Sequence, residues 1–155
     1  MPNFFNIHLT KQTTMKDSTQ NSNNNKRHEN AYAVYQKKDS VLYITFKKQT
    51  ELTHDAAKKV VKDRMNFQAY ACYSVICDVS DLTSITYDAR EYLSTDGSNM
   101  LTAVALVCDK EPIYTMGRCY LFYNRPTVPT QIFKNKNEAE KYINKITRSH
   151  DTYRN

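Results

Sequence analysis

The segment YSVICDV, at residues 73–79, is apolar at nearly every position, and so is LTAVALVC at residues 101–108. Continuous apolar runs of this length are typical of strands that other elements cover on both faces. Stretches with the apolar spacing of helices alternate with these two runs. This alternation predicts an α/β protein with a mostly parallel sheet, joined by right-handed crossovers.

The residues before the first buried run predict a hairpin and a helix. AYAVYQK at 31–37 and VLYITFKK at 41–48 are rich in β-branched and aromatic residues, with turn-forming residues such as Asp39 between them. Thr53 is suited to an N-cap, and residues 54–70 carry an amphipathic helical pattern. The sheet is therefore expected to be mixed, because the hairpin adds an antiparallel strand.

The residues after the second buried run predict two helices with a short strand, TQIFK at 130–134, between them. Pro112 is suited to the first turn of a helix, and Asn137 with Glu140 predicts a capping box for the last helix. The expected order is β-β-α-β-α-β-α-β-α, with five strands and about four helices. The helices are expected at residues 53–70, 86–97, 112–124 and 137–147.

The first part of the chain differs from the rest in composition. Residues 16–30, KDSTQNSNNNKRHEN, contain no apolar residue and so have nothing to bury. We expect residues 1–30 to form a disordered leader, residues 31–148 a single domain, and residues 149–155 a frayed C-terminus. Met15 is an alternative start of the protein.

Composition narrows the class of protein. The 155-residue chain has 40% hydrophobic and 25% charged residues, as ordinary globular proteins do. Its two glycines exclude a glycine-rich phosphate loop. The net charge of +6 comes from basic residues scattered among acids, whereas nucleic-acid binders concentrate theirs on one face. We therefore expect no nucleic-acid partner.

Cysteine spacing and hydropathy indicate the cellular compartment of the protein. The four cysteines show no C-x-x-C spacing, and Cys77 and Cys108 lie inside the buried runs, where a free thiol behaves as a small hydrophobe. Reduced cysteines predict a cytoplasmic protein. No stretch approaches the ~20 apolar residues of a membrane span, so we expect no stable membrane insertion.

Four stretches carry a resemblance to a known family: ELTHDAAKKVVKDR (51–64), VICDVSDLTSITYDAREYL (75–93), LTAVALVCD (101–109) and NRPTVPTQIFKNKNEAEKYI (124–143). Over residues 31–147 the chain resembles the STAS fold of anti-sigma-factor antagonists, and more closely the small uncharacterised bacterial proteins labelled STAS-like or CRAL-TRIO-like. The resemblance implies a single STAS-like domain, in a bacterial regulatory protein that binds another protein and is not an enzyme.

In the antagonist family, the first turn of a helix carries a phosphorylated serine, and the matching position here is Ala89. A phosphorylation switch would therefore need a hydroxyl in the preceding connection. Asp78 and Asp109 end the two buried strands, where ligands bind in open α/β sheets; the alternative is that these acids bond to nearby backbone. The candidate regulatory loop consists of Asp78, Ser80, Thr83, Ser84, Thr86, Arg90 and Asp109.

Catalytic signatures are missing from the sequence. It has no G-x-S-x-G elbow, no H-E-x-x-H motif and no Walker loop. The histidines lie away from the predicted strand ends and do not cluster with the cysteines; they are His8, His28, His54 and His150. We expect no catalytic residue, metal or cofactor, and keep an enzyme with an unrecognised site at Asp78 and Asp109 as an alternative.

The segment IYTMGRCYLFYN at 113–124 is apolar around most of its second half. Successive helical residues point ~100° apart, so adjacent rings cannot all face one sheet. The candidate partner or ligand surface consists of Arg118, Tyr120, Phe122 and Tyr123. The alternative is that the leader or the link between Pro126 and Pro129 shields these rings.

Three hypotheses follow. The first is a protein-interaction module that binds another protein or itself, the latter as a homodimer through residues 113–124. The second is a binder of a small apolar ligand or lipid, which an apolar cavity under the third helix would favour. The third is the unrecognised enzyme, which converging polar groups at Asp78 and Asp109 would favour.

Overall fold

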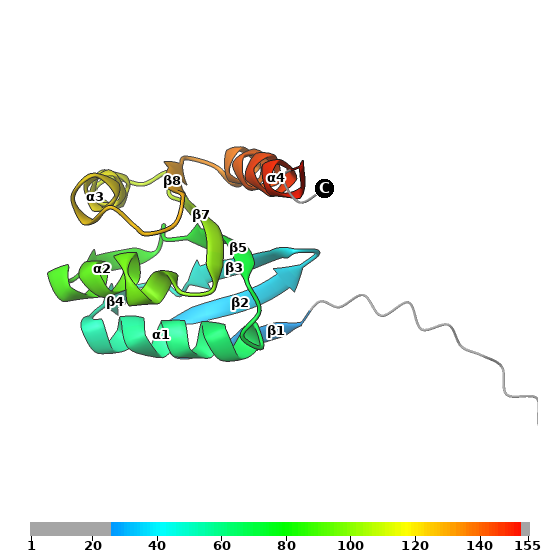
Figure 1. The fold of residues 1–155 in the computed structure, drawn as a ribbon. Helices are drawn as coiled ribbons and strands as arrows, with labels where there is room; N and C mark the ends of the chain where they lie inside the picture. The colour runs from blue at the N-terminus through cyan, green and yellow to red at the C-terminus, as the bar shows by residue number, and fades with distance from the viewer. Residues whose placement is uncertain (1–25, 153–155) are drawn as a thin grey trace, which may run out of the picture.

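A six-stranded sheet forms the centre of the protein, whose computed structural model describes residues 26–152 (Figure 1). Its order is β1-β2-β3-β5-β7-β8. The first three strands pair antiparallel and the last four, from β3 to β8, pair parallel. The strands are β1 (Arg27–Glu29), β2 (Ala33–Lys38), β3 (Val41–Phe46), β5 (Tyr73–Asp78), β7 (Leu101–Val107) and β8 (Thr130–Phe133). The predicted mixed, mostly parallel α/β sheet is confirmed.

Four α-helices form within the described residues: α1 (His54–Phe67), α2 (Tyr87–Ser94), α3 (Ile113–Cys119) and α4 (Lys136–Thr152). A 3₁₀ turn, η1 (Asp96–Ser98), follows α2, and a π-helical turn, η2 (Tyr120–Asn124), continues α3. The predicted N-cap of α1 forms, because the Thr53 hydroxyl accepts a hydrogen bond of 3.3 Å from the Ala56 amide. Thr86 caps α2 in the same way.

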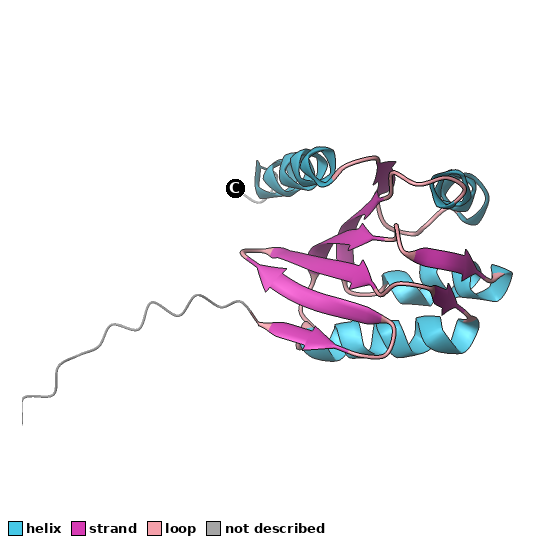
Figure 2. Cartoon of the chain, turned by 180° about the vertical axis from the view of Figure 1, so that it is seen from behind, coloured by secondary structure: helices cyan, strands magenta, loops and turns pink. Residues whose placement is uncertain are grey.

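Helices cover both faces of the sheet (Figures 1 and 2). Residues of α1, α2 and α3 pack on one face, and α4 packs on the other through Ala139 and Ile143. The central strand β7 serves both layers: Val104 and Leu106 belong to the first, and Ala103 and Ala105 to the second. The continuous apolar runs in the sequence reflect this two-sided burial.

The described residues form eight strands, so the predicted count of five was too low. Besides β1, the extra strands are β4 (Thr50–Leu52) and β6 (Leu82–Ile85), which pair parallel in a separate small sheet. β6 lies in the stretch that was predicted to be a polar connection. Strands of three or four residues are too short for the two-residue alternation to be visible in sequence.

A strand forms before Ala31, at Arg27–Glu29, so residues 27–30 do not fit the predicted disordered leader. β1 pairs with β2, and His28 stacks on Phe67 with ring centroids 6.2 Å apart. Backbone pairing and ring contacts thus hold a segment that has no aliphatic side chains to bury. The predicted disorder of residues 1–25 and the alternative start at Met15 lie outside the described residues.

The last helix also differs from expectation at both ends. Its N-terminal cap is Asn135, not Asn137, because the Asn135 side-chain oxygen accepts a hydrogen bond of 3.0 Å from the Glu138 amide. At the other end the helix continues through Thr152, where residues 149–155 were expected to fray. The Ser149 hydroxyl donates to the Lys145 carbonyl one turn earlier, within the helix.

Candidate functional site

The acids predicted at the strand ends make local contacts. Asp78 ends β5 and accepts a hydrogen bond of 3.0 Å from the Ser80 amide. Lys110 donates to the Asp81 carboxylate at 3.0 Å, and this bond raises the pKa of Lys110. Asp109 is exposed beside that pair. Asp78 thus bonds to the backbone of the turn that follows its strand.

The hydroxyls of the candidate regulatory loop lie along β6 and the start of α2. Thr83 donates a hydrogen bond of 3.2 Å to the Thr50 carbonyl and so ties β6 to β4. Thr86 caps α2, and its hydroxyl also bonds to the Asp88 carboxylate, which lowers the pKa of that acid. Ser80 and Ser84 are half-buried, whereas Thr83 and Thr86 are exposed.

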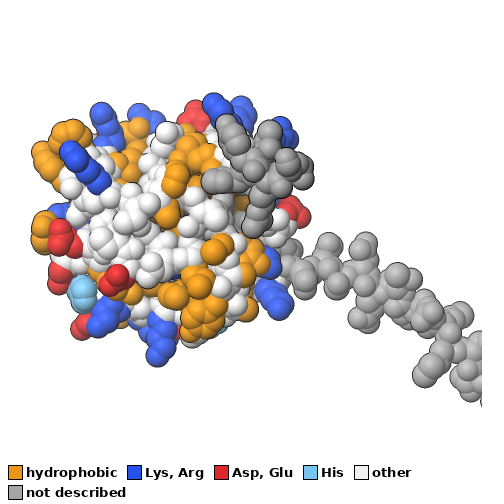
Figure 3. Space-filling view, in the orientation of Figure 1, with side chains coloured by type: hydrophobic (Ala, Val, Ile, Leu, Met, Phe, Trp, Pro, Cys, Tyr) orange, Lys and Arg blue, Asp and Glu red, His pale blue; other side chains and the backbone are white. Residues whose placement is uncertain are grey.

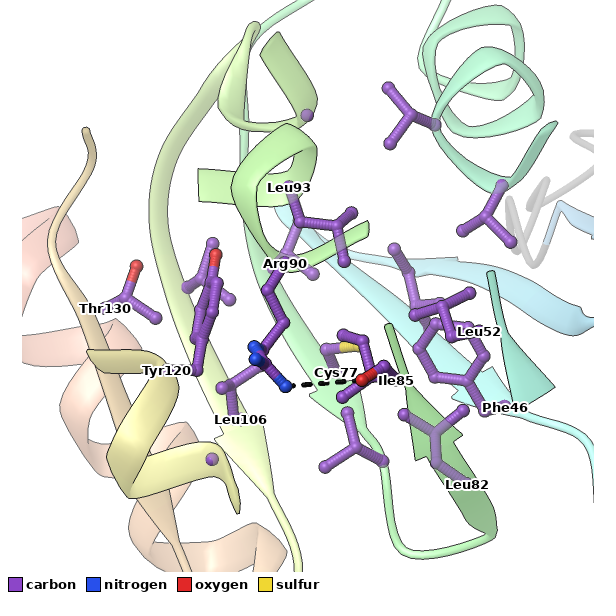
Figure 4. Close-up of a pocket in the computed structure, with 18 of the residues that line it drawn as sticks. Phe46, Leu52, Cys77, Leu82, Ile85, Arg90, Leu93, Leu106, Tyr120 and Thr130 are labelled. Carbon is purple, nitrogen blue, oxygen red and sulfur yellow. Dashed lines mark hydrogen bonds between the residues drawn. The ribbon is translucent and has the colours of Figure 1, made fainter. Parts of the chain in front are cut away.

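A cavity of about 130 Å³ lies between α3 and the sheet, bounded also by α2 and the small sheet (Figure 4). Its walls are almost entirely apolar. Cys77, Val104 and Leu106 line it from the central strands, and Ile113, Met116 and Tyr120 line it from the third helix. Arg90 alone of the seven residues of the candidate regulatory loop also lines the cavity.

The cavity exists because α3 lies close to one strand and leaves others uncovered. A Cβ on Gly117 would lie 2.4 Å from the Cδ1 atom of Ile132, so a larger residue here would force that side chain to move, and glycine allows the close approach of α3 to β8. On the neighbouring strand, Val104 and Leu106 are only partly buried although β7 lies between two other strands. Residues at the centre of a sheet are normally buried when a helix packs directly on them.

Two guanidinium groups are the charged groups among the cavity-lining residues, which include no carboxylate and no histidine. Arg64, on α1, is 2% exposed and donates to the Gly97 carbonyl at 3.2 Å and to the Asn99 carbonyl at 2.9 Å. Burial lowers its pKa to about 10, so Arg64 is still charged at neutral pH. The electrostatic potential inside the cavity is therefore positive.

The remaining polar groups of the cavity are neutral at physiological pH. Burial, with a smaller effect from Asp78, raises the pKa of the Cys77 thiol to about 12, so this cysteine is a poor nucleophile. Burial also raises the pKa of the Tyr120 phenol, which remains a hydroxyl. These groups can donate hydrogen bonds to a ligand, but they supply no base.

The aromatic segment divides between the cavity and the surface. Tyr120 lines the cavity, whereas Phe122 and Tyr123 are 67% and 75% exposed. Their rings meet edge to face, with centroids 5.0 Å apart. Figure 3 shows hydrophobic side chains on the surface at the end of the molecule that α3 occupies. Arg118 is exposed and lies outside the cavity lining.

Sequence reasoning missed Arg64, although a signal was present. Ala57, Val61 and Gln68 share its face of α1, and all three are buried. A charged residue on the inward stripe of an amphipathic helix indicates a buried charge with specific partners. Among residues 26–152, no group of three or more His, Cys, Asp or Glu side chains is placed to hold a metal ion. The same residues include no helix that is both long and apolar enough to cross a membrane.

Comparison with known proteins identifies the fold. A family model described as "Domain of unknown function (DUF7793)" matches residues 35–147. The chain is also similar to a crystal structure from Shewanella loihica PV-4, that of an uncharacterized DUF3478-family protein with a SpoIIAA-like fold. The similarity covers 75% of this chain and 98% of the other, with 14% sequence identity and a TM-score of 0.52. No curated protein matches the sequence significantly. The predicted STAS-like fold is confirmed.

Proposed function

The chain belongs to the DUF7793 family, a domain of unknown function, and from this premise we propose that it is a non-enzymatic STAS-like module that binds a small apolar ligand under α3. One observation carries the proposal: Val104 and Leu106 remain only partly buried on a central strand, where they line the cavity that α3 leaves open. Apolar surface left open inside a fold is most simply stabilised by a ligand that covers it.

The size of the cavity sets the size of the ligand. At about 130 Å³ it is close to the engineered apolar cavities of roughly 150 Å³ that stay dry and take up benzene. The ligand, or the part of it that enters, therefore has an apolar body of about six carbons. A complete lipid tail is longer, so a lipid would extend beyond the cavity.

The chemistry of the lining supports binding without catalysis. General acid–base catalysis needs a group that can hold and release a proton near neutral pH. The lining offers two arginines, a protonated thiol and a phenol whose pKa burial raises further. The free state of all four cysteines suits a reducing compartment, which supports the expected cytoplasmic localisation.

Titration with a small neutral ligand tests the proposal. Hexan-1-ol added to methyl-labelled protein should shift the NMR signals of Val104, Leu106 and Met116, which line the cavity. The methyl groups of Ala103 and Ala105, on the opposite face of the sheet, are the internal control. A Val104→Phe variant, which fills the cavity, should fold and lose the shifts of Leu106 and Met116. Equal shifts on both faces, or none in the wild type, would contradict a specific cavity site.

The exposed pair Phe122 and Tyr123 favours a second candidate function, capture of a partner protein or of a second copy of the chain. Aromatic residues supply most of the hot spots of protein interfaces. The two rings lie outside the cavity, on the continuation of the helix that covers it. Ligand binding and partner capture can therefore coexist in one module and are tested separately.

A further inference from the structure

We propose that the ligand of the cavity is a small monocarboxylate, with its apolar body inside the cavity and its carboxylate paired with the guanidinium of Arg90. This inference rests on the proposed function and deepens it by naming the chemical class of the ligand. It starts from a difference between the two arginines of the lining.

Arg90 has unused hydrogen-bonding capacity. One of its terminal nitrogens donates to the Ile85 carbonyl at 3.3 Å, and its guanidinium carbon lies 5.9 Å from the centre of the Tyr87 ring. None of the ion pairs among residues 26–152 includes Arg90. A guanidinium carries five N–H donors in a planar fork, so several remain available to a ligand.

The position of Arg90 directs those donors at the cavity. The side chain extends from α2 toward the interior, with its guanidinium near Ile85 (Figure 4). It is half-buried, so its charge lies where solvent screens it less than at an open surface. Arg64, by contrast, is engaged by the carbonyls of Gly97 and Asn99 and by the side-chain oxygen of Gln68. Arg64 therefore adds positive potential, and Arg90 is the group that can bind an anion.

The chemistry of a single available fork favours a carboxylate. Two parallel N–H donors match the two oxygens of a carboxylate. A phosphate monoester carries nearly two charges and a third oxygen, which call for further cations. The Tyr120 hydroxyl also lines the cavity, but Figure 4 shows it at the end of the ring away from the Arg90 guanidinium. The single guanidinium fork therefore suits one carboxylate.

Calorimetric and NMR titrations of the full chain with three matched ligands test this proposal. Hexanoate, hexan-1-ol and hexyl phosphate share a six-carbon body and differ in their head groups. Wild-type protein should bind hexanoate at least about tenfold more tightly than hexan-1-ol, because a charged hydrogen-bonded pair forms only with the acid. Arg90→Gln should remove this preference and leave the affinity for hexan-1-ol within about twofold. Arg118→Gln, which removes an exposed arginine outside the cavity, is the matched control and should change neither affinity.

The outcomes separate this inference from the proposed function. If hexan-1-ol binds in the cavity and hexanoate binds no better, the inference is wrong and the proposed function stands. If neither binds, both are wrong. Hexyl phosphate binding as tightly as hexanoate would overturn the assignment to monocarboxylates. If Arg90→Gln fails to fold, Arg90→Lys gives the comparison: it keeps the charge but loses the fork, so it should weaken hexanoate binding only in part.

Discussion

The side-chain amide of Asn30 donates a hydrogen bond of 2.7 Å to the carboxylate of Asp63, on α1. The same amide donates to the Tyr35 hydroxyl at 3.1 Å, and the Asn30 side-chain oxygen accepts from two backbone amides. This one residue therefore joins the turn before β2 to α1. It lies in the segment that composition alone predicted to be disordered.

Asn30→Ala should lower the free energy of unfolding by about 1–3 kcal/mol, because it leaves buried polar groups without partners. Urea denaturation measures the change. Gln36→Ala, at an exposed position of β2, is the control and should change stability by less than about 0.5 kcal/mol. An Asn30→Ala protein as stable as the control would show that the turn contributes nothing to the fold.

The pH dependence of stability should also depend on Asp63. Burial acts to raise the pKa of this acid, but hydrogen bonds from Lys59 and Asn30 outweigh it and hold the pKa below 3.8. A lowered pKa means that the ionised form stabilises the fold at pH values above 3.8 and that this stabilisation is lost as pH falls through the lower native pKa. Stability curves from pH 6 to pH 2 should therefore be flatter for Asp63→Asn than for the wild type, and parallel curves would contradict this.

Leu106→Ala should destabilise the protein less than Leu42→Ala. Leu42 is 1% exposed in the core, so its truncation should cost about 2–5 kcal/mol. Leu106 already borders a cavity and is only partly buried, so less packing is lost, and we expect about half that cost. The two variants are compared by urea denaturation in ligand-free protein. Equal costs would mean that α3 packs on β7 more tightly than the cavity implies.

Phe122→Ala and Tyr123→Ala should leave stability within about 0.5 kcal/mol of the wild type, because both rings lie on the surface. If this pair binds a partner or a second copy, each substitution should weaken the association by about 2 kcal/mol or more. Sedimentation over a range of concentrations measures self-association, and co-purification from the native host measures partner capture. A loss of several kcal/mol of stability without any change in assembly would make these rings part of the core.

A phosphorylation switch, if the module has one, should use Ser80, Thr83, Ser84 or Thr86, because Ala89 has no hydroxyl. A phosphate on Thr86 would lie at the N-terminus of α2, where the helix dipole contributes ~0.3–1 kcal/mol, but it would also replace the cap and repel Asp88. Mass spectrometry of the protein from native cells, under several growth conditions, tests this segment. Consistent absence of phosphate on these four residues would remove the switch.

The long, strongly patterned elements could be predicted from sequence. The runs at 73–79 and 101–108 became the central strands β5 and β7, and Thr53 capped α1 as expected. The pairing of β4 with β6 could not be predicted, because each strand is short and its partner lies about 30 residues away. The cavity was one of several alternatives for the aromatic helix, because the position of α3 depends on tertiary contacts such as the one between Gly117 and Ile132.

Arg90 was selected from sequence because it lies near the end of a strand and the start of a helix. The structure places it in the lining of the apolar cavity, which neither Asp78 nor Asp109 lines. Sequence can place a residue at an end of the sheet, but the side of the helix that it occupies there depends on how the helix is rotated against the sheet. That rotation follows from the burial of Ala89 beside it.

The two edges of the main sheet affect how the protein can associate. β1 is three residues long, is fully exposed and carries the ion pair between Arg27 and Glu29; β8 has four residues and follows Pro129. Short, charged or proline-flanked edge strands are poor templates for a strand from another molecule. A partner is therefore expected to recognise this module through side chains on its helices, and the chain should resist aggregation by edge-to-edge growth of its sheet.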